Sequence, residues 1–309
     1  MIGRIVEVAD DRRYLFVSRG FMVVQETDGE RKELGQVPLD DIAAVIANAH
    51  GLTYSNNLLV SLAERGAPFV LCGANHNAVG MILPIDGNFQ QAKRFDAQLA
   101  ASKPVQKRMW AEIVRAKLAQ QASVLDATGA PAAPLTALVS KVRSGDPDNM
   151  EAQGARRYWS LLFGDGFRRD QGSGGLNGLL NYGYTVYRAA MARAIVAAGL
   201  HPTLGIHHCN EGNAMRLVDD LLEPFRPMVD LLVWQLHRRE ETAVTPDTKR
   251  ALVHSLYDDM QTDSGATPAM VCMQRLAVSV AQIYLGEREK LDLPLPGLPL
   301  ALASNFSDN

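Results

Sequence analysis

The first ninety residues alternate short apolar runs with turn-forming residues, a pattern that predicts β-strands. These runs are rich in β-branched and aromatic residues, and they read RIVEV, YLFVS, FMVVQ, AAVIA, PFVLC and VGMIL. The Asp-Gly pair within residues 26–31 is typical of a tight hairpin. One helix is expected among the strands, in NNLLVSLAERG, with asparagine caps at its start and Gly66 at its end.

Beyond residue 90 the apolar positions recur at helical spacing. The clearest segments are SKPVQKRMWAEIVRAKLAQQASVLDA and LLNYGYTVYRAAMARAIVAAGLHP, the second of which ends at Gly199 with Pro202 beyond it. The pattern therefore predicts an α+β protein, with an N-terminal β-rich domain (residues 1–90) followed by a larger all-α catalytic domain (residues 91–309). We expect the two to be joined near residues 85–95.

Composition narrows the class of protein. The chain has 309 residues, of which 47% are hydrophobic and 21% charged, as in a soluble globular protein. No apolar run approaches the ~20 residues that span a bilayer, and the first residues lack the apolar core of a signal peptide. Cys72, Cys209 and Cys272 are scattered in no metal-binding spacing. We expect a cytoplasmic protein without disulfides or structural zinc.

The distribution of charge says more than its total. The net charge is −3, but residues 93–117 contain seven basic and two acidic side chains. Because fields beyond ~10 Å are screened, such a segment could bind phosphates although the whole chain is acidic. The alternative is an ordinary solvated helix face.

Acidic residues cluster on a half-apolar helix in LGIHHCNEGNAMRLVDDLLEPFRP. We expect that helix to begin at Asn213, as its cap, and to end at Glu223 before a proline. Asp220 and Glu223 are three residues apart and share a face, but Asp219 is four residues from Glu223 and is equally eligible. Adjacent carboxylates repel each other unless a cation or a proton lies between them.

Two adjacent histidines precede these acids, in what reads as an extended segment. Because successive side chains of an extended chain point to opposite sides, only one of His207 and His208 can readily join the acids. The other is expected to pack or to donate hydrogen bonds, which is the ordinary role of a lone histidine.

A further acid lies on an upstream helix. Asp146 as cap and Pro147 as first helical residue predict a helix that ends near Phe163. Glu151 begins an apolar stripe on it, continued by Ala155, Tyr158 and Leu162, whereas Arg156 and Arg157 turn away. The alternative role for a glutamate so near a helix start is to complement the helix dipole.

One imidazole and two or three carboxylates suit Mg²⁺ or Mn²⁺ better than structural zinc, and such a site near arginines serves phosphoryl transfer. Two other functions remain open, a non-catalytic nucleic-acid-binding scaffold and an Fe(II) oxygenase, although adjacent histidines fit the oxygenase geometry poorly. If the acids only repel one another, replacing Glu223 by alanine should leave the metal-free melting temperature unchanged or raise it.

Several blocks of the chain resemble the type II branch of the CRISPR-associated integrases of spacer acquisition, the Cas1 family. The blocks include GRIVEVADDRRYLFVSRGFMVV, VPLDDIAAVI, GMILPIDGNF, LNGLLNYGYTVYRAAMARA, GLHPTLGIHH and LVDDLLEPFRP. The resemblance implies a β-domain followed by a helical catalytic domain. It further implies a homodimer that assembles with the small Cas2 protein, binds duplex protospacer DNA, and inserts it into a CRISPR repeat; an RNA-guided Cas effector is a possible further partner.

The family pattern, carried over by position, makes Glu151, His208 and Glu223 the metal ligands and Asp220 an accessory catalytic acid. His208 is thereby chosen over His207, and Asp220 over Asp219. We expect four basic side chains to contact the DNA backbone, and these are Lys107, Arg108, Arg156 and Arg157. The loop CNEGNAMR departs from the family pattern in being small and acidic, and its Glu211 could add a ligand or alter DNA contacts.

Overall fold

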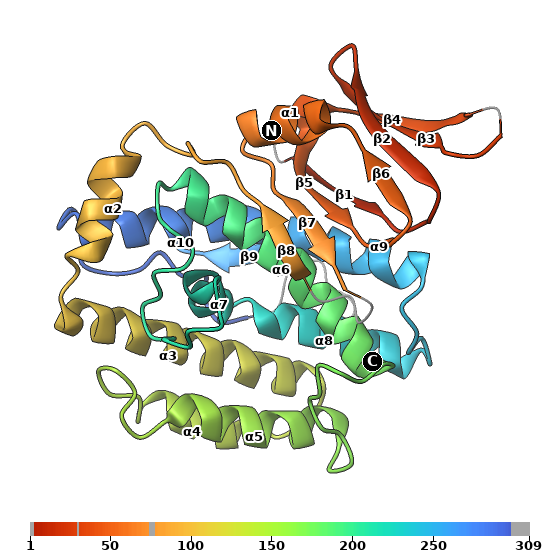
Figure 1. The fold of residues 1–309 in the computed structure, drawn as a ribbon. Coiled ribbons are helices and arrows are strands. Elements are labelled where there is room, and N and C mark those ends of the chain that lie inside the picture. Colours follow the sequence, from red (N-terminus) through yellow and green to blue (C-terminus); the bar gives the residue numbers. More distant parts are fainter. Residues whose placement is uncertain (1–2, 30, 74–77, 298–309) are drawn as a thin grey trace.

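The computed structural model describes residues 3–29, 31–73 and 78–297. Strands make up most of the N-terminal part and helices most of the rest, which confirms the α+β prediction (Figure 1). Within the described ranges, no helix combines the length and the apolar character needed to cross a membrane.

Two four-stranded sheets form the N-terminal part. The first has the order β1-β5-β7-β8, in which only the β7–β8 pair is antiparallel. The second has the order β4-β3-β2-β6, in which only the β2–β6 pair is parallel. The bounds are β1 Arg4–Val8, β2 Arg13–Ser18, β3 Phe21–Glu26, β4 Glu33–Pro38, β5 Ile42–Ala47, β6 Leu52–Tyr54, β7 Phe69–Cys72 and β8 Ala78–Ile82.

Strand β5 explains how the two parts of the chain are joined. Its sequence IAAVIA is apolar throughout and all six residues are buried, as expected of a parallel strand covered on both faces. Ile42 and Val45 pack into a core shared with the second sheet and helix α1 (Asn56–Glu64). Ala44 and Ile46 belong to the core of the helical part. The predicted boundary falls in the connection between β8 and the next helix, and the division into domains stays a prediction.

The helical part is arranged around two long helices, α3 and α6 (Figure 1). Helices α4 and α5 pack on α3, while α7, α8, α9 and α10 pack on α6. Their bounds are α2 Gln91–Leu99, α3 Lys103–Ala127, α4 Ala133–Val139, α5 Met150–Phe163, α6 Leu176–Ala197, α7 Arg216–Leu222, α8 Arg226–Arg238, α9 Pro246–His254 and α10 Ala269–Tyr284.

The helical part is not helical throughout, because a two-stranded hairpin, β9 (Asp259–Thr262) and β10 (Gly265–Pro268), precedes α10. Short hydrophilic strands were also missed: β4 reads ELGQVP and β6 only LTY, and neither carries an apolar run. These strands form because neighbouring strands offer free backbone groups, a tertiary effect that side-chain pattern does not record.

Three predicted helix caps were wrong, by one to three residues. Helix α1 is capped by Ser55, whose side chain accepts from the amide of Leu58, and not by the asparagines that follow it. Helix α7 begins at Arg216 and not after Asn213. Helix α5 begins at Met150 after a cap at Asn149, although its predicted end at Phe163 is confirmed.

Candidate functional site

The first part of the candidate site is the start of α5, where the carboxylate of Asp146 adds to the cap at Asn149. It accepts hydrogen bonds from the backbone N–H groups of Met150 and Glu151, with N···O distances of 2.8 Å and 3.0 Å. Asp146 was predicted as the cap itself, but it lies three residues before the cap Asn149, and its side chain reaches forward to the free amides at the helix start. The backbone of Glu151 is thereby fixed at the N-terminal end of the helix.

Helix α3 supplies a side chain that the sequence analysis counted only as part of a basic segment. Lys117 is buried, and its ammonium group contacts Glu151 Oε1 and lies 2.5 Å from Glu223 Oε2. Burial by itself would lower the pKa of Lys117, but the charges of Glu223 and Glu151 outweigh it and raise that pKa above its ordinary value. A protonated lysine therefore joins the two predicted metal ligands.

Glu223 follows the last residue of α7 and has cations on both sides. Its Oε1 lies 3.2 Å from Nε of Arg226, the first residue of α8. Burial would raise the pKa of Glu223, yet Arg226 and Lys117 bring it below its ordinary value. The premise that the clustered acids only repel one another was therefore wrong, because the buried Lys117 lies between Glu151 and Glu223 and Arg226 contacts Glu223 as well. Removing the Glu223 carboxylate would leave Lys117 and Arg226 short of a partner.

Asp220 holds the segment that carries the histidines. Its Oδ2 accepts hydrogen bonds from the backbone N–H groups of Ile206 at 2.6 Å and His207 at 3.0 Å. Its Oδ1 lies 2.6 Å from Nδ1 of His208. Gly205 is required here, because a Cβ atom would lie 2.7 Å from the carbonyl oxygen of His208. Both oxygens of Asp220 are used in positioning this loop, so its role is to orient His208.

The two histidines differ in their contacts. The ring of His207 stacks on Trp110, with centroids 4.2 Å apart and planes 1° from parallel, and burial lowers its pKa. The hydrogen bond to Asp220 raises the pKa of His208 and turns Nδ1 toward the acid, which leaves Nε2 for another partner. A carboxylate behind the ligating imidazole is the usual arrangement at metal-binding histidines.

The donors thus fit a divalent ion in type, with two carboxylates and one oriented imidazole. Among the described residues, however, no three histidine, cysteine or acidic side chains converge closely enough to hold a metal ion. Lys117 stands between Glu151 and Glu223, so the carboxylates close around an ammonium group.

A polar pocket of about 390 Å³ adjoins this cluster, because Arg226 belongs to both. Three arginines from separate segments line it, and they are Arg169, Arg188 and Arg226. Asp219, over which Asp220 was chosen from the family pattern, lies in the pocket wall, with an oxygen 2.9 Å from Nη2 of Arg188. These residues were missed because they are far apart in the sequence and only the fold brings them together.

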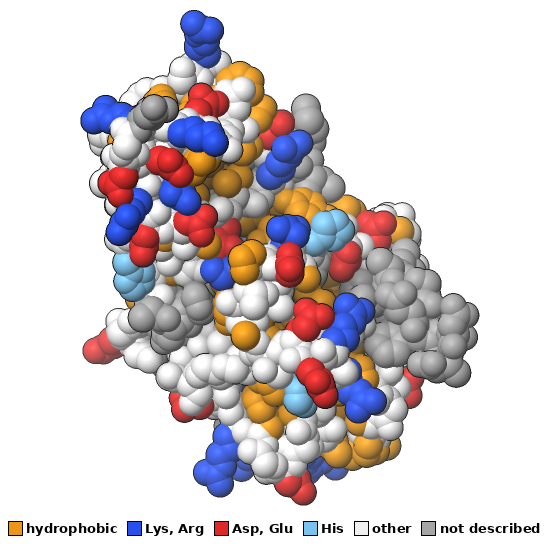
Figure 2. Space-filling view, turned by 90° about the vertical axis from the view of Figure 1, so that its right-hand side faces the viewer, with side chains coloured by type: hydrophobic (Ala, Val, Ile, Leu, Met, Phe, Trp, Pro, Cys, Tyr) orange, Lys and Arg blue, Asp and Glu red, His pale blue; other side chains and the backbone are white. Residues whose placement is uncertain are grey.

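Arg169 is held by neutral groups. Its guanidinium donates to the side-chain oxygens of Asn177 at 3.0 Å and Asn181 at 2.7 Å, and burial lowers its pKa. Within the described part of the chain, no carboxylate oxygen lies within 4.0 Å of it. The pocket therefore carries an excess of positive charge, with three arginines and one aspartate in its lining. By contrast, acidic and basic side chains are interspersed on the face of the molecule shown in Figure 2.

The four predicted DNA contacts lie outside this pocket. Lys107 and Arg108 are exposed on the first half of α3, and Arg156 and Arg157 are exposed on α5. They stay predictions. Glu211 is also exposed, in the loop before α7.

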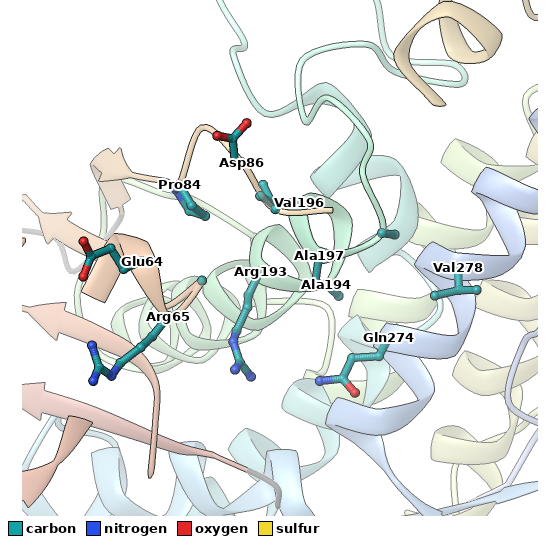
Figure 3. Close-up of a pocket in the computed structure, with 13 residues that line it drawn as sticks. Glu64, Arg65, Pro84, Asp86, Arg193, Ala194, Val196, Ala197, Gln274 and Val278 are labelled. Atoms are coloured by element: carbon teal, nitrogen blue, oxygen red, sulfur yellow. The ribbon is translucent and has the colours of Figure 1, made fainter. Parts of the chain in front are cut away.

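A larger cavity, of about 490 Å³, lies at the junction of α1, the β8–α2 connection, α6 and α10 (Figure 3). Its lining includes Glu64, Arg65, Arg193 and Gln274. None of the residues predicted for the site lines it, so the larger cavity and the charged cluster are separate features.

Comparison with known proteins assigns the chain to a family. The family model described as CRISPR associated protein Cas1 matches residues 6–253. The chain is 37% identical over 269 residues to a CRISPR-associated endonuclease Cas1 of Neisseria meningitidis serogroup C, an alignment that covers 85% of this chain and 88% of the relative.

Two solved structures share the fold at low sequence identity. A casposase bound to integration product aligns with a TM-score of 0.79 at 18% identity, covering 94% of this chain and 92% of that one. A chain of a Cas6-RT-Cas1–Cas2 complex aligns with a TM-score of 0.76 at 15% identity, covering 96% of this chain and 36% of that one.

Proposed function

This chain belongs to the Cas1 family, and from that premise we propose that it is a divalent-metal-dependent DNA integrase and nuclease of CRISPR adaptation. One observation carries the proposal. Arg226 connects Glu223, which Lys117 joins to Glu151, to a pocket with three arginines, so a surface suited to phosphate adjoins metal-type donors. A nuclease or integrase needs these two features side by side.

The proposed substrate is double-stranded DNA, both protospacer and CRISPR repeat. In the reaction, the 3′-hydroxyl oxygen of the protospacer bonds to a phosphorus atom of the repeat, and that phosphorus loses its bond to the 3′-oxygen of the target strand. The proton of the attacking hydroxyl is balanced by the proton that the leaving oxygen gains. Because one phosphodiester replaces another, the same site should also release misjoined ends.

The residues have distinct roles in this proposal. Glu151, Glu223 and Nε2 of His208 would hold Mg²⁺ or Mn²⁺, which supplies charge stabilisation at the phosphate when bound. Asp220 orients His208, and Arg226 orients Glu223 through the contact at 3.2 Å.

The arginine pocket has a separate role, because phosphates of the bound strand are the anions that its guanidinium groups suit. Arg169 is the strongest candidate, since neutral asparagines hold its guanidinium and, among the described residues, no carboxylate forms an ion pair with it. Binding of DNA should therefore weaken steeply as the salt concentration rises.

We propose the partners on the evidence of the relatives. One solved structure that shares the fold is part of a complex that contains Cas2, and another is bound to an integration product. A homodimer assembled with Cas2, with an RNA-guided Cas effector as a further partner, is the arrangement that we propose for this chain.

The test is strand transfer of a labelled duplex into a supercoiled plasmid that carries a repeat, with purified chain and Cas2. We expect joining with Mg²⁺ or Mn²⁺, none with EDTA, and no special requirement for Fe²⁺. Glu223→Ala should abolish joining, whereas Glu289→Gln, at an exposed acid beyond α10, should not change it. Robust joining by Glu223→Ala would overturn the catalytic assignment, and DNA binding without any joining would favour the scaffold.

A further inference from the structure

Lys117 is an unusual residue for the middle of α3. It lies four residues after Ile113 and one before Leu118, both of which are fully buried, and its own residue exposure is 6%. A lysine is rarely buried so far unless its charge is paired. Its position on the apolar face directs the ammonium group into the carboxylate cluster and away from solvent.

The ammonium group joins carboxylates from two separate elements. It contacts Glu151 at the start of α5 and lies 2.5 Å from Glu223 Oε2 after α7. In oxygen sites, Mg²⁺ lies about 2.1 Å from its ligands. A cation shared by these two oxygens would therefore occupy nearly the position of the Lys117 nitrogen, and two positive charges at such separation repel strongly.

From this geometry we propose that Lys117 is a resident cation of the metal-free site, which a divalent metal ion must displace in order to bind both glutamates. The inference rests on the proposed function, because it takes Glu151 and Glu223 as metal ligands. In the metal-free protein, Lys117 removes the repulsion between the acids and keeps them within reach of each other. It does so at the expense of metal affinity, because each binding event must first break its two ion pairs.

The lysine side chain suits this role. Its charge is a compact point on a flexible stem of four carbons, so the ammonium group can leave while the helix stays in place. Arg226, the other cation at Glu223, is held differently, because its guanidinium also stacks over Tyr184 at 4.9 Å. We therefore assign displacement to Lys117 and a fixed position to Arg226.

The experiment measures Mn²⁺ affinity of the full-length chain by the electron paramagnetic resonance signal of free Mn²⁺. Lys117→Met keeps the length of the side chain and removes the charge without adding an oxygen ligand. We expect it to bind Mn²⁺ at least tenfold more tightly than the wild type and to melt at a lower temperature without metal. Saturating Mn²⁺ should raise its melting temperature more than it raises that of the wild type.

A matched control is available in Lys249, a second buried lysine whose ammonium group lies 2.8 Å from Glu7. Lys249→Met should also lower the melting temperature, but Mn²⁺ affinity should stay within twofold of the wild type. Unchanged or weaker Mn²⁺ binding by Lys117→Met would overturn the inference. If instead the wild type binds no Mn²⁺ and joins no DNA, the proposed function itself fails.

A second measurement needs no variant and so does not depend on folding of Lys117→Met. Reductive methylation of the wild type, quantified by peptide mass spectrometry, reports how accessible each lysine is. Mn²⁺ should increase labelling of Lys117 at least threefold and leave Lys249 unchanged. Equal labelling of Lys117 with and without Mn²⁺ would contradict displacement.

Discussion

Two buried lysines of the helical part, Lys117 and Lys249, pair with carboxylates, and the other partners of those carboxylates differ. The difference distinguishes an ion pair that stabilises the fold from one at the proposed metal site. Lys249 on α9 lies 2.8 Å from Glu7 on β1. Glu7 also accepts hydrogen bonds from Asn48 at 2.7 Å and from the hydroxyl of Tyr182 at 2.8 Å. Neutral donors thus share the carboxylate with the cation, and the whole arrangement ties the first sheet to α6 and α9.

The carboxylates around Lys117, those of Glu151 and Glu223, have cations and not neutral donors as their partners. One ammonium group is shared by Glu151 and Glu223, and Arg226 is the other cation at Glu223. Within the described ranges, no neutral hydrogen-bond donor contacts the carboxylate of either glutamate. A carboxylate fully satisfied by fixed donors has nothing left to bind, whereas two acids that share one movable cation can exchange it for another.

The largest effect is expected from the same substitution at the two kinds of carboxylate. Glu151→Gln should reduce the rate of strand transfer by about 10³-fold, because a neutral amide neither binds nor balances a divalent ion well. Glu7→Gln should leave the rate within twofold when it is assayed well below its melting temperature. The measurement is single-turnover joining of labelled duplex at saturating Mn²⁺, and equal losses in the two variants would remove the distinction between the sites.

Stability should show the reverse order. Glu7→Gln should lower the free energy of unfolding by about 3 kcal/mol, because it leaves Lys249 buried without its charged partner. Glu151→Gln should cost less, since Lys117 keeps its contact with Glu223. Urea unfolding of the metal-free variants measures both values, and a larger loss in Glu151→Gln would count against the structural role assigned to Glu7.

Asp230 on α8 is a further buried acid that sharpens the comparison, because the arginines that act on it, Arg226 and Arg169, form no ion pair with it. No lysine or arginine nitrogen of the described residues lies within 4.0 Å of Asp230, to which Tyr184 donates a hydrogen bond. Burial raises the pKa of Asp230 to about 7, whereas Glu223, equally buried but paired, has its pKa lowered. Charge partners, and not burial alone, therefore decide which acid is ionised.

The pH dependence of Asp230 follows from that shift. Between pH 5 and pH 7 the unfolded chain has lost the proton that the folded chain retains, so folding stability falls as the pH rises. Asp230→Asn removes this slope, and relative to the wild type it should gain about 2 kcal/mol between pH 5 and pH 8. Urea unfolding of both proteins at the two pH values checks it; a constant difference would mean that Asp230 is ionised throughout.

The smallest effect concerns the arginine pocket. Arg169→Gln should weaken duplex DNA binding about tenfold at moderate salt and reduce the salt dependence, with little change in stability, because neutral asparagines hold the side chain. Arg288→Gln, at an exposed position beyond α10, is the matched control. Fluorescence anisotropy of labelled duplex at several salt concentrations gives both quantities; equal affinities for the two variants would exclude the pocket from DNA binding.

Part of this site could be predicted from the sequence, and the rest could not, for physical reasons. Helical spacing and the family resemblance selected Glu151, His208 and Glu223, and the structure brings the two glutamates together through Lys117. Lys117 itself carried a signal, because it lies on the apolar face of a helix, four residues after Ile113. It was counted with its exposed basic neighbours, where its charge seemed ordinary.

The arginine pocket and the strands β4 and β6 could not be predicted from any local sequence pattern. Arg169, Arg188 and Arg226 lie on three segments that meet only through the packing of α6, α7 and α8. The strands β4 and β6 lack an apolar pattern, because their place in a sheet depends on backbone pairing with neighbours. Spacing along one element predicts which side chains share a face, but it does not predict which elements come together.

The most direct measurement is the anomalous scattering of Mn²⁺ in crystals of the full-length chain. We predict one strong peak within about 2.5 Å of oxygen atoms of Glu151 and Glu223 and of Nε2 of His208. We also predict that the Lys117 ammonium group has moved away from its position between the two glutamates. Lys117 in place between them, with no Mn²⁺ peak at their oxygens, would contradict metal binding by displacement of the lysine.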